Sequence, residues 1–261
     1  MELFVLVNLV SLGPDIVLAH AIDSFAVPSQ WIPVAFSAVA PPLYGLSWWL
    51  GRRSGERGLG RILALAIGWV AVGVGIAGLL LHLEGTFFRE RTLRNLVYTA
   101  PFAAPLAYTG LGLLILLERM RVRDEREWVQ WVLVLALGGF VGNFALSLAD
   151  HAQNGFFVWQ EWLAVASSAL AIGFLASALL FPMSRSALRA CAAVMGLQVV
   201  VGVAGLALHN AANWAGPAES MLDNFLYGAP AFAPMLFADL ALLGWIGLWA
   251  QYRCGQTSPA A

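Results

Sequence analysis

Four histidines are the residues of this sequence best suited to chemistry, because imidazole binds haem and metal ions and exchanges protons near neutral pH. They form two matching pairs: His20 lies 131 residues before His151, and His82 lies 127 residues before His209. A lone histidine at the end of an apolar helix most often caps the helix or bonds to a neighbour. Four at matching positions, with no other histidine in the chain, favour ligand binding instead.

The matching positions belong to an internal duplication. Three pairs of stretches are similar: 20–40 and 151–171 share ten of 21 residues, 74–82 and 201–209 share seven of nine, and 95–106 and 224–235 share Asn, Tyr, two Ala and two Pro. The matches include His, Trp, Asn, Tyr and Pro, so apolar composition alone does not explain them. The sequence therefore predicts two tandem repeats, residues 1–117 and 128–261, joined by a charged linker, residues 118–127.

The composition predicts the class of protein that contains these repeats. The chain is 60% hydrophobic and 11% charged, whereas a soluble domain has about 25% charged residues. Since a membrane span needs about 20 apolar residues, we expect eight spans: 3–21, 31–50, 61–82, 95–117, 128–149, 162–182, 187–209 and 225–250. We predict an all-α integral membrane protein with eight transmembrane helices arranged as two tandem, parallel four-helix repeats. The net charge of −1 gives no basic surface for a nucleic acid partner.

The arginines predict the orientation, because cytoplasmic loops are enriched in basic residues. Eleven of the fourteen basic residues follow even-numbered spans: Arg52, Arg53, Arg57, Arg61, Arg119, Arg121, Arg123, Arg126, Arg185, Arg189 and Arg253. We therefore expect both termini in the cytoplasm. The protein would be a multi-pass protein of a bacterial-type inner membrane, in contact with the lipid bilayer.

The predicted bundles favour haem as the ligand. In an up-down four-helix bundle the first and third helices lie across a diagonal, so we expect His20 to face His82, and His151 to face His209, near the outer (periplasmic) face. Two opposed imidazoles can be the axial ligands of one haem b. This predicts a membrane cytochrome with one bis-histidine haem in each repeat. It would transfer electrons, with quinol or another membrane redox subunit as its partner.

Glycines and tyrosines near the histidines are further candidates for cofactor contacts. Four glycines lie four and seven residues before a histidine, hence on its helix face: Gly75, Gly78, Gly202 and Gly205. We expect them to leave an open surface for a porphyrin edge, although small residues also serve close helix packing. Tyr98 and Tyr227 each follow an asparagine by three residues and could contact a haem propionate or a quinone.

Two acids lie inside the predicted spans. Asp15 and Asp239 would be costly in the hydrocarbon, and such residues are often functional. Whether they conduct protons or have structural roles stays open.

Two other functions remain open. The four histidines, with nearby carboxylates, also suit a divalent transition metal, which would make the chain a metal-handling protein or a proton-coupled transporter. No HxH, HxxxH or ExxH spacing occurs, so no single helix presents a chelating pair. The third alternative is an accessory subunit of a larger membrane complex, whose histidines bind pigment or simply pack. The sequence assigns no catalytic residue and no enzyme activity.

The predicted layout resembles that of the haem A synthase family. Members of that family also have eight spans in two duplicated four-helix halves, with a histidine pair near the outer face of each. The family's Glu-x-x-His-Arg pattern is missing, since no histidine here is followed by arginine and His82 is followed by leucine. The family's histidines also lie at the starts of even-numbered spans, whereas those of this sequence end odd-numbered ones. The resemblance is therefore architectural, covers the whole chain and transfers no catalytic residue.

Overall fold

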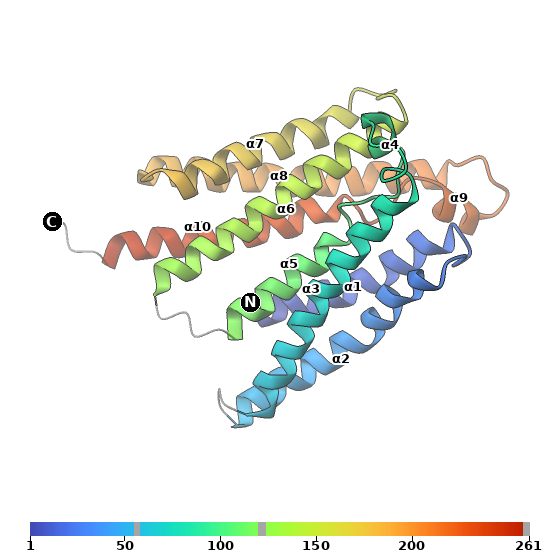
Figure 1. The fold of residues 1–261 in the computed structure, drawn as a ribbon. Helices are drawn as coiled ribbons and strands as arrows, with labels where there is room; N and C mark the ends of the chain where they lie inside the picture. Colours follow the sequence, from blue (N-terminus) through green and yellow to red (C-terminus); the bar gives the residue numbers. More distant parts are fainter. Residues whose placement is uncertain (55–57, 120–123, 258–261) are drawn as a thin grey trace. The chain divides into compact units, whose positions relative to one another are not determined.

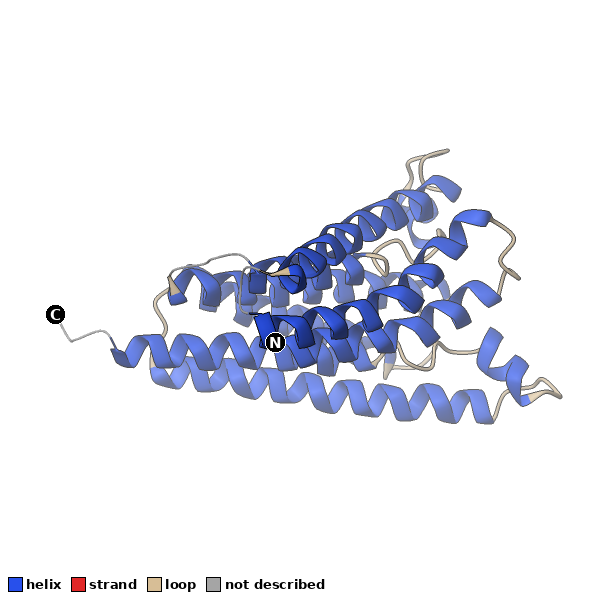
Figure 2. Ribbon diagram, turned by 90° about the horizontal axis from the view of Figure 1, so that it is seen from below, coloured by secondary structure: helices blue, strands red, loops and turns tan. Residues whose placement is uncertain are grey.

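The structure is a computed structural model, and it describes residues 1–54, 58–119 and 124–257. In these residues the chain forms ten α-helices and one short 3-10 helix, with no β-strand (Figures 1 and 2). The first half contains α1 (Glu2–Ala21), η1 (Pro28–Gln30), α2 (Trp31–Ser54), α3 (Leu59–Gly85), α4 (Leu93–Val97) and α5 (Leu106–Arg119). The second half contains α6 (Glu125–Gln153), α7 (Glu161–Leu180), α8 (Arg185–Trp214), α9 (Met221–Tyr227) and α10 (Met235–Thr257). Residues 120–123 of the predicted linker, and Arg57, lie outside the described residues.

Six of the described helices are long and apolar enough to cross a membrane: α1, α3, α6, α7, α8 and residues Met235–Cys254 of α10. The prediction of an all-helical, multi-pass membrane protein in contact with lipid is therefore confirmed at this coarser level. The helix α2 is not among the six, and it contains Pro41 and Pro42. The helix α5 has only 14 residues, whereas a complete span needs about 20. Eight spans stay a prediction.

The fourth and eighth predicted spans are not continuous helices. Residues 98–105 between α4 and α5, and residues 228–234 between α9 and α10, are non-helical. The physical reason is proline, which lacks the backbone N–H and whose ring clashes with the preceding turn of a helix. Pro101 and Pro105 lie in the first non-helical run, and Pro230 and Pro234 lie in the second. The predicted spans 95–117 and 225–250 are therefore each interrupted by a non-helical run.

The chain divides into two compact units, and each unit takes segments from both halves of the sequence. Unit 1 consists of Met1–Leu80, Pro105–Arg121 and His209–Ala231. Unit 2 consists of Leu81–Ala104, Val122–Leu208 and Phe232–Ala261. We call residues 81–104 the first connecting segment and residues 209–231 the second connecting segment. Each connecting segment thus belongs to the unit that contains most of the opposite half.

Each unit has its own apolar core. In unit 1, α1 packs against α2 and α5, and the core includes Val5, Leu9 and Ile115. In unit 2, α6 packs against α7 and α10, and Phe140 and Leu175 are fully buried. Apolar side chains on the helix faces turned away from these cores remain exposed, as expected for helices that contact lipid.

Close helix packing is visible at four glycines of α3 and α8. A Cβ atom on Gly75 would lie 2.6 Å from the backbone nitrogen of Thr109 and 2.8 Å from the carbonyl oxygen of Pro105, at the start of α5. A Cβ atom on Gly78 would lie 2.7 Å from the Cβ of Pro105. In unit 2, a Cβ atom on Gly202 would lie 2.9 Å from the carbonyl oxygen of Pro234, and one on Gly205 would lie 2.9 Å from its Cβ. These glycines let α3 approach α5, and α8 approach α10, more closely than any side chain would allow.

Replacing Gly75 by alanine should destabilise the protein, because the new Cβ atom would meet backbone atoms that cannot move aside. We expect the free energy of unfolding to fall by about 1–3 kcal/mol, the usual cost of overpacking a core. The measurement is unfolding in detergent, followed by circular dichroism. Gly73→Ala is the matched control, since it lies on the same helix and a Cβ atom there has no heavy atom within 4 Å. Equal stability of the two variants would contradict this packing.

Candidate functional site

The four histidines lie near the ends of four helices. His20 and His151 are in the last turns of α1 and α6, His82 is in the last turn of α3, and His209 is five residues before the end of α8. All four are half-buried. Unit 1 contains His20 and His209, whereas unit 2 contains His82 and His151. Each of the two predicted diagonal pairs is therefore divided between the two units.

Three of the histidines have the same ring nitrogen bonded to a backbone carbonyl. The Nδ1 atom of His82 lies 2.9 Å from the carbonyl oxygen of Pro101, and Nδ1 of His209 lies 2.9 Å from that of Pro230. Nδ1 of His20 lies 3.0 Å from the carbonyl oxygen of the preceding helical turn. A carbonyl can only accept a hydrogen bond, so Nδ1 carries the proton in each case. In the neutral ring Nε2 then has the lone pair, and it is the nitrogen that can bind a metal or a haem iron.

The fourth histidine has a carboxylate neighbour that the sequence analysis missed. The Nδ1 atom of His151 lies 3.8 Å from Oε2 of Glu161. Glu161 is in the first turn of α7 and is only 8% exposed, which is unusual for a carboxylate. The duplication held the signal, because the position that matches Glu161 in the first repeat is Gln30. The carboxylate is therefore a difference between the two similar stretches, and matching residues alone do not indicate it.

The turns after His20 and His151 have the same unusual backbone. Phe25 and Phe156 adopt left-handed conformations with φ of 53° and 52°, which are uncommon for residues with bulky side chains. In each turn the phenylalanine N–H donates to the carbonyl oxygen of the histidine, at 3.3 Å and 3.0 Å. Each phenylalanine ring also stacks on the ring of a tryptophan six residues later, with centroids 4.4 Å and 3.9 Å apart. The two turns thus hold an aromatic stack beside each of these histidines.

In unit 2, side chains from α6 and from the first connecting segment itself bind that segment. The Thr99 hydroxyl donates to the carbonyl oxygen of His82 at 2.6 Å. The Gln153 side chain, from the last turn of α6, donates to the carbonyl oxygen of Val97 at 2.7 Å. These bonds pair backbone carbonyls that have no helical partner.

In unit 1, two asparagines fold the second connecting segment back on itself. The buried Asn213 amide donates to the carbonyl oxygen of Ala229 and accepts from its N–H, both at 2.8 Å. Asn224 forms the same pair of hydrogen bonds with Ala218: its amide donates to the carbonyl oxygen at 3.2 Å and accepts from the N–H at 2.9 Å. The second connecting segment is thereby closed at two points by side-chain amides.

The asparagine and the tyrosine of each predicted Asn–Tyr pair have different surroundings. Asn95 and Asn224 both donate to backbone carbonyls of their own connecting segments. Tyr98 and Tyr227 are 58% and 63% exposed. The asparagines therefore have a structural explanation, and contacts of the tyrosines with a cofactor stay a prediction.

The glycines next to the histidine faces are explained by packing. The space beside Gly75 and Gly78 is filled by residues of α5, and the space beside Gly202 and Gly205 by residues around the start of α10. The open surface that we expected beside them for a porphyrin edge is not found. Their role as cofactor contacts has no support beyond the sequence pattern.

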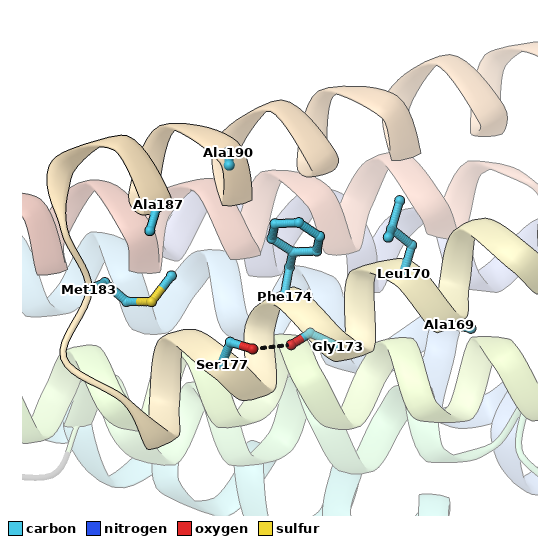
Figure 3. A pocket seen from close by; sticks show the side chains of 8 residues that line it. All are labelled: Ala169, Leu170, Gly173, Phe174, Ser177, Met183, Ala187 and Ala190. Atoms are coloured by element: carbon cyan, nitrogen blue, oxygen red, sulfur yellow. Dashed lines mark hydrogen bonds between the residues drawn. The ribbon is translucent and has the colours of Figure 1, made fainter.

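A groove of about 490 Å³ lies between α7 and the start of α8 in unit 2 (Figure 3). Its lining is small and apolar, and its one hydroxyl, on Ser177, donates to the carbonyl oxygen of Gly173 at 2.8 Å. No residue of the groove is ionisable, and none belongs to the predicted site.

Neither the metal geometry nor the comparisons identify a known site. Among the residues that the structure describes, no group of three or more His, Cys, Asp or Glu side chains is placed to hold a metal ion. Comparison with protein-family models, with curated proteins and with solved structures finds no match to this chain.

Replacing Asn213 by alanine should loosen the second connecting segment. The change removes two hydrogen bonds and leaves the N–H and the carbonyl of Ala229 without their partner, which should cost about 2–4 kcal/mol. Thermal unfolding and faster hydrogen exchange in residues 228–231 are the measurements. Asn154→Ala is the control, since Asn154 is exposed at the end of α6. If both variants unfold at the same temperature, the side chain does not hold the segment.

Proposed function

We propose that the chain spans the membrane eight times, as two tandem, parallel four-helix repeats with both termini in the cytoplasm of a bacterial-type cell. The support is the recurrence of local geometry. In the described residues each half contains five α-helices, and the fourth of each set, α4 or α9, is the short one. A left-handed phenylalanine, a bond from a histidine to a proline carbonyl, and contacts of two glycines with one proline occur in both halves. In this arrangement the 14-residue α5 and the non-helical residues 98–105 together complete the fourth crossing.

The function that the geometry supports best is binding of haem b through pairs of histidines, with electron transfer near the outer face. The observation that carries this proposal is the matched bond from Nδ1 of His82 and His209 to a proline carbonyl, 2.9 Å long in both. Histidines that bind metals usually donate their other ring N–H to a carbonyl or carboxylate, which fixes the tautomer and makes Nε2 a better ligand. Two such imidazoles are sufficient for one haem.

Haem, when bound, would supply one-electron transfer, and the residues of this chain would bind it, orient its ligands and shield it from water. The histidines would hold the iron, the proline carbonyls would orient the imidazole rings, and the apolar helices would exclude water. A quinol would be a suitable donor, because its oxidation to the quinone would release two electrons, one for each oxidised haem, and two protons to the water at the outer face. The redox partner of the chain would be the quinol itself or another membrane redox subunit.

One observation favours a metal ion as the second candidate. The Glu161 carboxylate lies 3.8 Å from the His151 ring, and an imidazole with a carboxylate suits a divalent transition metal. A metal-handling protein or a proton-coupled transporter would use such a pair.

Purified protein should show the optical spectrum of a bis-histidine cytochrome, with a sharp α-band after reduction by dithionite. His82→Ala and His209→Ala should each lower the haem-to-protein ratio by half, because each removes one axial ligand. Asn154→Ala is the control and should keep the full ratio. A reduced spectrum without an α-band would falsify the haem proposal, and metal analysis of the same sample would then test the second candidate.

A further inference from the structure

The two connecting segments are exchanged between the halves of the sequence. The first connecting segment begins within the last turns of α3 in the first half, yet its helix α4 packs against α6 of the second half. The second connecting segment begins within the last turns of α8, and its helix α9 packs against α1 of the first half. The exchange is therefore reciprocal: the contact of α4 with α6 lies within unit 2, and the contact of α9 with α1 lies within unit 1.

Hydrogen bonds in unit 2 connect this exchange to two histidines. Gln153, two residues after His151, donates to the carbonyl oxygen of Val97 at 2.7 Å. Four residues further on, the carbonyl oxygen of Pro101 accepts from Nδ1 of His82. Four residues of extended chain span at most about 14 Å, so the two bonded ends of this short segment keep His82 and His151 at the same end of unit 2.

We propose that each ligand site is built by both halves of the chain, with His82 and His151 as one pair and His20 and His209 as the other. The ligand, haem b, rests on the proposed function above. The pairing differs from the diagonal one that the duplication by itself predicts, in which both histidines of a pair come from the same repeat. The reason is that His82, in the first connecting segment, belongs to the same unit as His151. His209, in the second connecting segment, belongs to the same unit as His20.

Chemical cross-linking tests the exchange without any bound group. In a chain with Cys191→Ala and Cys254→Ala, the variants Val97→Cys and Gln153→Cys are combined, and residues 120–123 are replaced by a protease site. A short bis-maleimide should join the two cysteines in detergent-solubilised full-length protein. After cleavage, the two halves should then stay together on a denaturing gel. Each single-cysteine variant should separate into two halves.

The pair Thr86→Cys and Asn95→Cys controls for access of the reagent, because the Thr86 hydroxyl donates to the carbonyl oxygen of Asn95 at 3.2 Å within the first connecting segment. Its cross-link is detected by mass spectrometry of the peptides. If this control pair reacts and the pair across the halves does not, the exchange is wrong. A product of twice the chain mass would show that the segment reaches a second copy, which also overturns the proposal.

Haem stoichiometry tests the pairing itself. If the wild type binds two haems, His82→Ala should bind one, and the double variant His82→Ala/His151→Ala should still bind one. The double variant His20→Ala/His82→Ala should bind none. Diagonal pairing requires the opposite result for the two double variants. A wild type without haem would refute the proposed function and the ligand, while the cross-link would still decide whether the halves share this segment.

Discussion

Backbone groups that a proline releases from a helix need new hydrogen-bond partners, and this requirement governs both connecting segments. Proline breaks the helices at residues 98–105 and 228–234 and leaves carbonyl groups without helical partners. The side chains of His82, Gln153 and Asn213 pair with some of these carbonyls. The few polar residues of a chain that is only 11% charged are thus placed where the backbone needs them.

The same bonds bear on why histidine is used. Asn213 pairs a carbonyl in the second connecting segment with an amide, and Gln153 does so in the first. An imidazole is therefore not needed to satisfy such a group, and a longer or shorter amide would serve at His82 and His209. What the imidazole adds is a second nitrogen, Nε2, with a lone pair in the tautomer that the carbonyl selects. The hydrogen bond to the proline carbonyl explains Nδ1 of these rings, and the haem proposed above would use Nε2.

The sequence predicts the helices well, because a long apolar run is enough to specify α1, α3, α6, α7 and α8. Hydropathy does not register a break of seven or eight residues in which alanine and phenylalanine accompany the prolines, so it does not give the bounds of α5 and α10. Spacing places Gly75 on the face of His82, but only the positions of Pro105 and Thr109 reveal that this face is filled. Glu161 was missed because it breaks the repeat, and the partners of the connecting segments depend on contacts distant in sequence.

Exchange of the connecting segments also constrains how the protein assembles. Unit 1 needs residues 1–80 and residues 209–231, so its last part is made after most of unit 2 has been synthesised. Unit 2 in turn needs residues 81–104 from the first half. Contacts over such sequence separations form late, because closing a long loop costs chain entropy before the contact repays it. Neither half of the sequence can therefore complete a unit alone, because each unit contains a segment from the other half. This dependence gives a physical reason for two nearly equivalent halves to stay in one chain.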